Sequence, residues 1–333
     1  MENIHVDSTS GGRVLNNSKK NIDEVFAEKF GERWLNYRSA WAKASSGKLT
    51  EFPLFVRTEA QFKCNSKCLM CVHGHKEIAE DYHYDEFMSF DTFKRIVDEC
   101  AEHNCPSLGI SQTNEPLLDP DWFERAKYAT EKSIMDIHFN TNGMLLTEEK
   151  SKQILDTGIT RLCVSLDAIT EETYKKIRIG LDFKTVLRNI EKFLELRNST
   201  GARLPALRVS FLLQKTNKHE LEAFKEYWVN KVDYISVQRY VPISPFDDEW
   251  SHAIEESPVG GKQNCSYPWE SLFVHGDGLV VPCAAHRAKH IAVGNIHKNS
   301  LYEIWHSLQI EELRRAIREN DLKSTKLCHS CLY

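Results

Sequence analysis

Residues 62–71 read FKCNSKCLMC and place Cys64, Cys68 and Cys71 in one short stretch with the spacing C-x3-C-x2-C. Three thiolates this close in sequence can hold three irons of a cuboidal four-iron, four-sulfur cluster, which leaves the fourth iron open for chemistry. An apolar run, Phe52–Val56, leads directly into the stretch and is typical of a buried strand. A strand that runs into a cysteine loop favours the cluster interpretation.

Two other interpretations of the same cysteines remain open at this point. A zinc site normally has four protein ligands, and His73 or His75 is placed to supply the fourth. The three cysteines are otherwise a chance group of buried thiols, since free cysteine is among the most buried residue types.

The composition limits the class of protein. The chain has 333 residues, ten cysteines and a formal charge of −5, enough for one large domain or one domain with a smaller appendage. The first twenty residues are polar, and no run of about eighteen apolar residues occurs. We therefore expect a cytoplasmic protein with no membrane partner, in which clustered thiols bind metals or catalyse rather than form disulfides. The mild acidic balance offers no basic stripe, so we expect no nucleic-acid partner.

Residues 1–50 are expected to form a disordered segment followed by one packing helix. Residues 1–20 have the composition of a disordered tail, whereas residues 21–45 have a helical period of large side chains. The members of that apolar face are Val25, Phe26, Phe30, Trp34, Tyr37 and Trp41. We expect this face to cover the core of the main domain. The segment is too short for a peptide-binding winged-helix module, which argues against a peptide substrate.

Residues 51–245 alternate apolar runs with amphipathic segments, which is the pattern of repeated βα units around a parallel sheet. The candidate strands are residues 52–58, 107–112, 135–140, 161–166, 207–213 and 234–240. Helix start signals occur at Asp91, Thr147, Thr170 and Asn217. The fold class expected is therefore α/β, a partial (β/α)6 TIM-like barrel. Functional groups of such a fold gather at the carboxyl ends of the strands.

The cysteine spacing, with the bulky Met70 just before the third cysteine, resembles the signature of the radical S-adenosylmethionine (radical SAM) enzymes. The resemblance implies that the open iron chelates the methionine amino and carboxylate groups of S-adenosylmethionine. It also implies reductive cleavage of that cofactor to a 5′-deoxyadenosyl radical, which abstracts a hydrogen atom from a substrate. The electron would come from an external low-potential donor such as flavodoxin or ferredoxin.

Two segments after Cys71 resemble the family's cofactor-binding segments. SQTNEP resembles the segment usually written GGEP, which implies that Asn114 and Glu115 contact the methionine amino group, although Thr113 and Asn114 replace the two glycines. FNTNG implies a cofactor contact from Asn140. A solvated glutamate in a turn is the ordinary alternative for Glu115.

Three further segments complete the expected cofactor and substrate pocket. LCVSLDA implies that Ser165 binds ribose or carboxylate oxygen, and KKIRIG implies that Arg178 pairs with the methionine carboxylate. SVQRYVP places Gln238 beside the cofactor, with Arg239 and Tyr240 as catalytic candidates that assist proton loss from the substrate. Helix caps and surface ion pairs are the ordinary structural roles of such side chains.

Residues 246–333 begin with a Pro-, Ser- and acid-rich linker and end in a second group of cysteines, Cys265, Cys283, Cys328 and Cys331. Between Cys265 and Cys283, Asp277-Gly278 predicts a hairpin turn. Four cysteines with one C-x2-C pair suit a structural zinc site as well as an iron–sulfur cluster. Their layout resembles the SPASM and twitch subdomains of radical SAM enzymes. That resemblance implies a second, auxiliary [4Fe-4S] cluster beside the first, and we expect all four cysteines to bind it.

A helix beginning after Ser300 is expected to pack beneath that second cluster. Glu303 completes a capping box with Ser300. The apolar face of the helix is expected to comprise Leu301, Ile304, Trp305 and Leu308.

The resemblance to twitch-bearing enzymes implies a function. A fully ligated auxiliary cluster accepts an electron, so the expected reaction is dehydrogenation of a secondary alcohol in a sugar or aminocyclitol-like small molecule. Peptide maturation by cross-link or thioether formation is an alternative, and so is epimerisation with Cys163 as hydrogen-atom donor. Ordinary core packing is the simpler expectation for Cys163. The non-enzymatic alternative is a zinc-binding scaffold.

Overall fold

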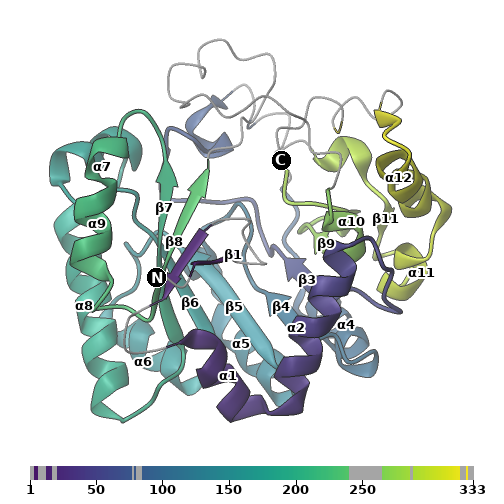
Figure 1. The fold of residues 1–333 in the computed structure, drawn as a ribbon, viewed down its shortest axis with the longest axis horizontal. Coiled ribbons are helices and arrows are strands. Elements are labelled where there is room, and N and C mark those ends of the chain that lie inside the picture. The colour runs from purple at the N-terminus through teal and green to yellow at the C-terminus, as the bar shows by residue number, and fades with distance from the viewer. Residues whose placement is uncertain are drawn as a thin grey trace.

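The protein is an α/β molecule built on one twisted sheet. A computed structural model describes residues 4–6, 13–16, 21–76, 79, 85–239, 265–285, 288–322 and 328. In this part of the chain the sheet has eleven strands in the order β1-β2-β8-β7-β6-β5-β4-β3-β9-β10-β11 (Figure 1). The sheet is open, with β1 and β11 at its two edges, and it agrees with the predicted partial barrel.

The six expected parallel strands are β3 to β8, and each pairs in parallel with the next along the chain. The bounds are β1 Ile4–Val6, β2 Arg13–Asn16, β3 Phe55–Thr58, β4 Ser107–Gly109, β5 Asp136–Thr141, β6 Arg161–Ser165, β7 Ala206–Leu213, β8 Tyr234–Arg239, β9 Ser271–Val274, β10 Leu279–Val281 and β11 Gly294–Asn295. The first of the six begins three residues later than predicted. Pro53 explains part of this, since it has no amide hydrogen for the ladder.

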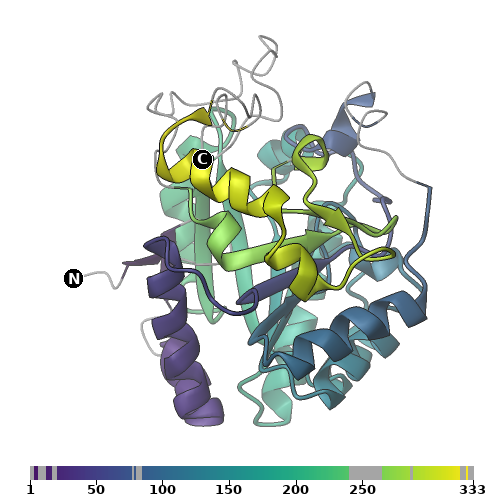
Figure 2. The ribbon, with the colours of Figure 1, turned by 90° about the vertical axis from the view of Figure 1, so that its right-hand side faces the viewer.

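Helices cover both faces of the sheet (Figures 1 and 2). Their bounds are α1 Ile22–Phe30, α2 Glu32–Ser45, α4 Phe90–Glu102, α5 Trp122–Glu131, α6 Glu148–Asp156, α7 Glu171–Ile177, α8 Phe183–Ser199, α9 Leu221–Trp228, α10 Tyr267–Glu270, α11 Leu301–Trp305 and α12 Leu308–Arg318. A large apolar core that includes Val56, Phe93 and Ile137 lies between the sheet and α4 to α9.

Two of the four predicted helix starts are confirmed. The side chains of Thr147 and Thr170 accept hydrogen bonds from backbone amides at the starts of α6 and α7. The other two differ from the prediction. Ser89 caps α4 in place of Asp91. Asn217 precedes the short 3-10 helix Lys218–Glu220 that leads into α9, but its side chain makes no capping hydrogen bond and instead donates to the carbonyl of Asp167, 2.9 Å away.

The aromatic face near the amino terminus packs on the sheet as expected, but on two helices rather than one. Gly31 has a φ of 58° and ends α1, because this conformation suits glycine and breaks the helical ladder. Phe26, Trp34 and other aromatic side chains of α1 and α2 join Phe55 and Phe273 in a second apolar core. This core lies on the sheet face opposite α4 to α9, so α1 and α2 close that face (Figure 1).

The prediction that residues 1–20 are disordered was wrong for residues 4–6 and 13–16. They form β1 and β2, and β2 pairs antiparallel with β8, from Arg13 opposite Val237 to Asn16 opposite Tyr234. The edge strand of a parallel sheet offers a row of backbone donors and acceptors, and β2 satisfies them. Tail composition carries no signal for such long-range pairing.

The carboxyl-terminal region continues the same sheet. β9 pairs in parallel with β3, and β10 returns antiparallel to β9. The predicted Asp277-Gly278 turn joins β9 and β10, with Gly278 at a φ of 82°. The predicted linker after residue 245 lies outside the described residues up to Cys265.

The capping box of α11 is confirmed, with both the Ser300 and Glu303 hydrogen bonds present. Leu301, Ile304 and Trp305 are buried as expected. Leu308 was assigned wrongly, because α11 ends at Trp305 and Leu308 opens α12 with 79% of its surface exposed. In the described part of the chain, no helix combines the length and apolarity needed to cross a lipid bilayer.

Candidate functional site

The cysteine loop follows β3 at the carboxyl edge of the sheet. The amide of Cys71 donates to the carbonyl of Cys68, 3.0 Å away, and turns the loop back on itself. The Sγ of Cys68 lies 3.0 Å from the hydroxyl of Ser66. The Nδ2 of Asn142, after β5, approaches the Sγ of Cys64 at 4.0 Å. The loop therefore places its thiols beside the end of a neighbouring strand.

The cysteine loop brings three thiols to one end of the sheet. Among the described residues, no three Cys, His, Asp or Glu side chains are arranged to bind one ion together. In a four-iron, four-sulfur cluster each cysteine ligates a different iron. Burial raises the pKa of Cys64 to about 11 and that of Cys71 to about 12. Ligation requires thiolates, so metal binding must release protons from these thiols.

The guanidinium of Arg178, at the end of α7, lies against the cysteine loop. Its Nη1 donates to the Sγ of Cys68 at 3.5 Å, and its Nη2 forms an ion pair with the buried carboxylate of Asp167. Burial raises the pKa of Asp167, although the Arg178 charge acts in the opposite direction. The described contacts of Arg178 thus join the cysteine loop to the end of β6.

Glu115 joins the loop after β4 to the end of β5. Its carboxylate accepts from the hydroxyl of Thr141 at 2.7 Å and from the amides of Asn142 and Leu117 at 2.8 and 3.2 Å. The side chain is 1% exposed, and burial raises its pKa. Glu115 is therefore a buried, multiply bonded group rather than a solvated glutamate in a turn.

Glu59 is a residue of this site that the sequence analysis missed. It directly follows β3, and its Oε1 accepts from the amides of Thr113 and Asn114 at 2.5 and 2.7 Å. Its Oε2 lies 3.5 Å from Nδ1 of His275, after β9. The signal that was available is an acidic residue between an apolar strand and the first cysteine. Its carboxylate binds the backbone where the resemblance has two glycines.

The remaining cofactor candidates lie at the same edge of the sheet. Met70 is 8% exposed and packs beside Phe62 and Cys68. The side-chain oxygen of Asn140 accepts a hydrogen bond from Arg208 at 3.2 Å. The backbone amide of Asn140 donates to the hydroxyl of Ser111. Asn114 accepts from the amide of Gln112 at 3.1 Å.

The last three of the six parallel strands, β6 to β8, carry candidate residues for which fewer contacts are described. Ser165 is half-buried and lies opposite Ser210 of β7, and Gln238 of β8 is half-buried opposite Leu212. Arg239 is the last residue of β8, opposite Leu213. Tyr240 lies outside the described residues.

The carboxyl-terminal cysteines gather on one apolar core. Cys265, Cys283 and Cys328 pack, partly buried, against the core that includes Trp269 and Leu313. Cys331 lies outside the described residues. Three cysteines separated widely in sequence thus border the same apolar core.

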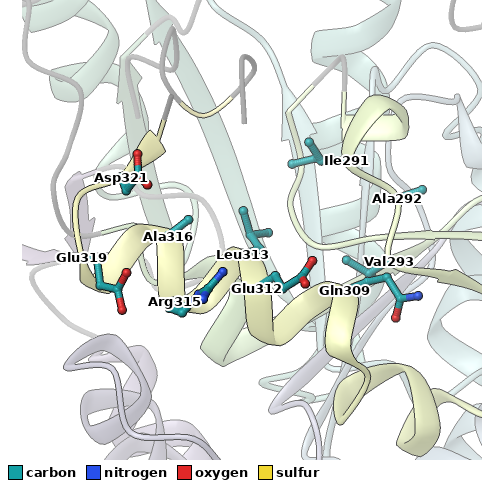
Figure 3. Close-up of a pocket in the computed structure, with 10 residues that line it drawn as sticks. All are labelled: Ile291, Ala292, Val293, Gln309, Glu312, Leu313, Arg315, Ala316, Glu319 and Asp321. Carbon is teal, nitrogen blue, oxygen red and sulfur yellow. The ribbon is translucent and has the colours of Figure 1, made fainter. Parts of the chain in front are cut away.

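A cavity of about 380 Å³ lies on the carboxyl-terminal part, between α12 and the segment before β11 (Figure 3). Its lining residues are Ile291, Ala292, Val293, Gln309, Glu312, Leu313, Arg315, Ala316, Glu319 and Asp321. Cys64, Cys68 and Cys71 are not among them, so this cavity is separate from the cysteine loop.

Comparison with known proteins decides the family. The model of the radical SAM superfamily matches residues 58–233, which is more than half of the chain. The chain belongs to the radical SAM superfamily. An iron-sulfur cluster-binding domain, SPASM, matches residues 265–332. The radical SAM and SPASM regions together have S-adenosylmethionine and two [4Fe-4S] clusters as cofactors. The zinc interpretations of both cysteine groups are therefore wrong.

The radical SAM region is similar to curated enzymes of several organisms. A probable GTP 3′,8-cyclase of Methanococcus maripaludis is 33% identical over 197 residues, which cover 59% of this chain and 61% of that protein. A tungsten-containing aldehyde ferredoxin oxidoreductase cofactor-modifying protein of Pyrococcus furiosus is 22% identical over 294 residues, covering 76% of this chain and 81% of its own. The chain thus spans less than two thirds of the cyclase it resembles.

A solved structure shows the same fold. SuiB of Streptococcus suis, bound to the precursor peptide SuiA, matches with a TM-score of 0.63 at 16% identity, over 84% of this chain and 71% of SuiB.

The predicted dehydrogenation of a sugar or aminocyclitol was wrong. Relatives of its radical SAM region at 30 to 33% identity are named for cyclisation of GTP, not for oxidation of a sugar or aminocyclitol. The error came from the auxiliary cysteines, because a fully ligated cluster can donate electrons as well as accept them and does not select a reaction.

Proposed function

We propose that this radical SAM enzyme forms a carbon–carbon bond within a purine ribonucleoside triphosphate, with GTP as the first candidate. The observation that carries the proposal is the 33% identity of its radical SAM region to a probable GTP 3′,8-cyclase. The carboxyl-terminal part is supported by a different comparison, which is its match to an iron-sulfur cluster-binding domain.

We assign the two clusters to the two cysteine groups. Cys64, Cys68 and Cys71 hold the first, and Cys265, Cys283, Cys328 and Cys331 hold the second. Residues 51–245 then form the barrel domain, after the amino-terminal segment 1–50, and residues 246–333 form the linker and auxiliary subdomain. When bound and reduced, S-adenosylmethionine and the first cluster supply the 5′-deoxyadenosyl radical that starts the reaction.

The residues around the cysteine loop position the reactants. Glu59 orients the loop that carries Asn114, which places that loop beside the cofactor methionine. Glu115 fixes the end of β5 against the same loop. Met70 excludes water from the cysteine loop, since it is buried against Phe62.

Other side chains at the strand ends complete the pocket. Asn140, Ser165 and Gln238 contact the ribose or adenine, and Arg178 steers the methionine carboxylate while paired with Asp167. Arg239, the last residue of β8, and Tyr240 are the candidates for contact with the substrate. These contacts hold the reacting atoms in line, which is the main contribution of a protein to radical chemistry.

The proposed reaction balances as an isomerisation. The hydrogen atom on C3′ passes to the 5′-deoxyadenosyl radical, C3′ bonds to C8 as the C8–N7 double bond opens, and one electron from a low-potential reductant with one proton reduces N7. The product therefore has the mass of GTP, and its C8 keeps its hydrogen but becomes tetrahedral, so the five-membered ring of the purine is no longer aromatic.

The test is a reaction under anaerobic conditions with reconstituted protein, S-adenosylmethionine, dithionite and GTP deuterated at C3′. We expect deuterium in 5′-deoxyadenosine and a GTP isomer with a changed ultraviolet spectrum and retention time. Formation of unlabelled 5′-deoxyadenosine with GTP unchanged would contradict the proposal.

A further inference from the structure

Two arginines and a histidine lie on the sheet face that α1 and α2 cover. Arg57, His138 and Arg208 are 8%, 5% and 4% exposed. Arg57 shares its face with Phe55, which belongs to the core of α1 and α2, whereas Val56 belongs to the core of the opposite face. His138 stacks on the ring of Phe55 at 5.1 Å and so lies on the same face.

Arg57 of β3 reaches across β4 to β5. Arg57, Gly109 and His138 stand opposite one another on three neighbouring strands. The Nη2 of Arg57 lies 3.5 Å from Nε2 of His138. A Cβ at Gly109 would lie 3.1 Å from Nε of Arg57, so the glycine leaves the space through which the guanidinium crosses the strand.

Arg208 of β7 reaches β5 from the other side. Asn140, Cys163 and Arg208 stand opposite one another on β5, β6 and β7. The Nε of Arg208 donates to the Sγ of Cys163 at 3.0 Å, and its Nη2 donates to Oδ1 of Asn140 at 3.2 Å. Cys163 has a small side chain, so the guanidinium of Arg208 can cross β6 and reach β5.

The two guanidiniums therefore converge on one strand. His138 and Asn140 are alternate residues of β5, so their Cα atoms are roughly 7 Å apart. Asn140 directly precedes Thr141 and Asn142, which contact Glu115 and approach Cys64. The converging groups thus lie just below the strand ends that carry the cysteine loop.

We propose that Arg57, His138 and Arg208 bind an oxyanion of the substrate, and on the proposed function this oxyanion is the phosphate chain of the nucleotide. Guanidinium groups present several donors in a planar fork that matches two oxygens of a phosphate. The inference rests on the proposed function for the identity of the anion but not for its binding to these residues.

The experiment measures binding of inorganic tripolyphosphate, guanosine and GTP to the reconstituted holoenzyme by isothermal titration. The variants are Arg57→Gln and Arg208→Gln, with Arg57→Lys and Arg208→Lys to keep the charge. Arg203→Gln is the matched control, because Arg203 is exposed and pairs with Glu28 at the surface. Iron content and far-ultraviolet circular dichroism show that each variant is folded and loaded.

We expect each Gln variant to weaken tripolyphosphate and GTP binding roughly 10- to 100-fold, with guanosine binding unchanged and the Lys variants intermediate. Wild-type affinity for tripolyphosphate in folded Gln variants would overturn the inference, even if GTP is converted. If GTP is not converted but tripolyphosphate binding depends on both arginines, the site stands and the proposed function fails. Arginine-dependent binding of citrate without binding of tripolyphosphate would overturn the phosphate assignment in favour of a carboxylate.

Discussion

The carboxylate of Glu59 lies 3.5 Å from Nδ1 of His275 while its other oxygen accepts from two amides of the loop after β4. Glu59 follows β3 of the barrel region, and His275 follows β9 of the carboxyl-terminal region. One side chain therefore connects the loop beside the cysteines to the part of the chain that carries the SPASM cysteines. The parallel pairing of β3 with β9 brings the two residues together.

Replacing Glu59 should weaken binding of S-adenosylmethionine. Glu59→Ala removes two hydrogen bonds to the backbone of Thr113 and Asn114, and such bonds to a charged group contribute about 1.5–3 kcal/mol each. We expect a rise of at least about tenfold in the KM for the cofactor. Glu59→Gln, which keeps an acceptor oxygen, should have a smaller effect, and the exposed Glu131→Gln should have none. An unchanged KM in Glu59→Ala would show that the loop orders itself without this carboxylate.

The two clusters should be separable by mutation. In the variant C64A/C68A/C71A we expect anaerobic iron analysis to find about four irons per chain, against about eight in the wild type. Cleavage of S-adenosylmethionine should be abolished. C100A/C105A is the control, since both residues are buried in the apolar core away from the loop. Retention of all the iron in the triple variant would contradict the assignment of the first cluster.

Arg314 should stabilise the carboxyl-terminal region. It is 1% exposed, donates to the carbonyls of Pro268 and Trp305, each at 2.9 Å, and stacks over the Trp305 ring. Arg314→Met leaves both carbonyls without this donor, so we expect the free energy of unfolding to fall by about 2–4 kcal/mol. Thermal unfolding measures this, and Arg315→Met on the exposed side of α12 is the control. Equal melting temperatures for the two variants would refute the role.

Glu270 should make stability depend on pH. Burial raises its pKa above the ordinary 4.5, although the hydroxyl of Ser45 donates to Oε1 at 2.6 Å. The folded state therefore holds the proton more tightly than the unfolded state does, and stability falls as the pH rises from about 4.5 through the raised pKa.

Glu270→Gln removes that titration. We expect the variant to melt at a higher temperature than the wild type at pH 8 and at nearly the same temperature at pH 4. Melting curves across this range measure the difference, with the exposed Glu312→Gln as control. A difference in melting temperature that does not depend on pH would contradict the assignment to this carboxylate.

Local signals in the sequence predicted much of this molecule. The C-x3-C-x2-C spacing indicated the cluster loop, the alternation of apolar runs and amphipathic segments indicated the six parallel strands, and Ser300 with Glu303 indicated the start of α11. Each signal depends on residues within a few positions of one another, where hydrogen bonds and side-chain period follow directly from the chain. The tail and the reaction lacked such signals, and both predictions were wrong.

Tertiary structure alone decided which distant residues meet. The sequence by itself shows Arg57, Gly109 and His138 on three separate segments, and only the register of β3, β4 and β5 places them in one row. In the same way, only the parallel pairing of β3 with β9 brings Glu59 to His275. The physical reason is that strand register depends on hydrogen bonds and packing summed over the whole sheet, so no short stretch of sequence contains it.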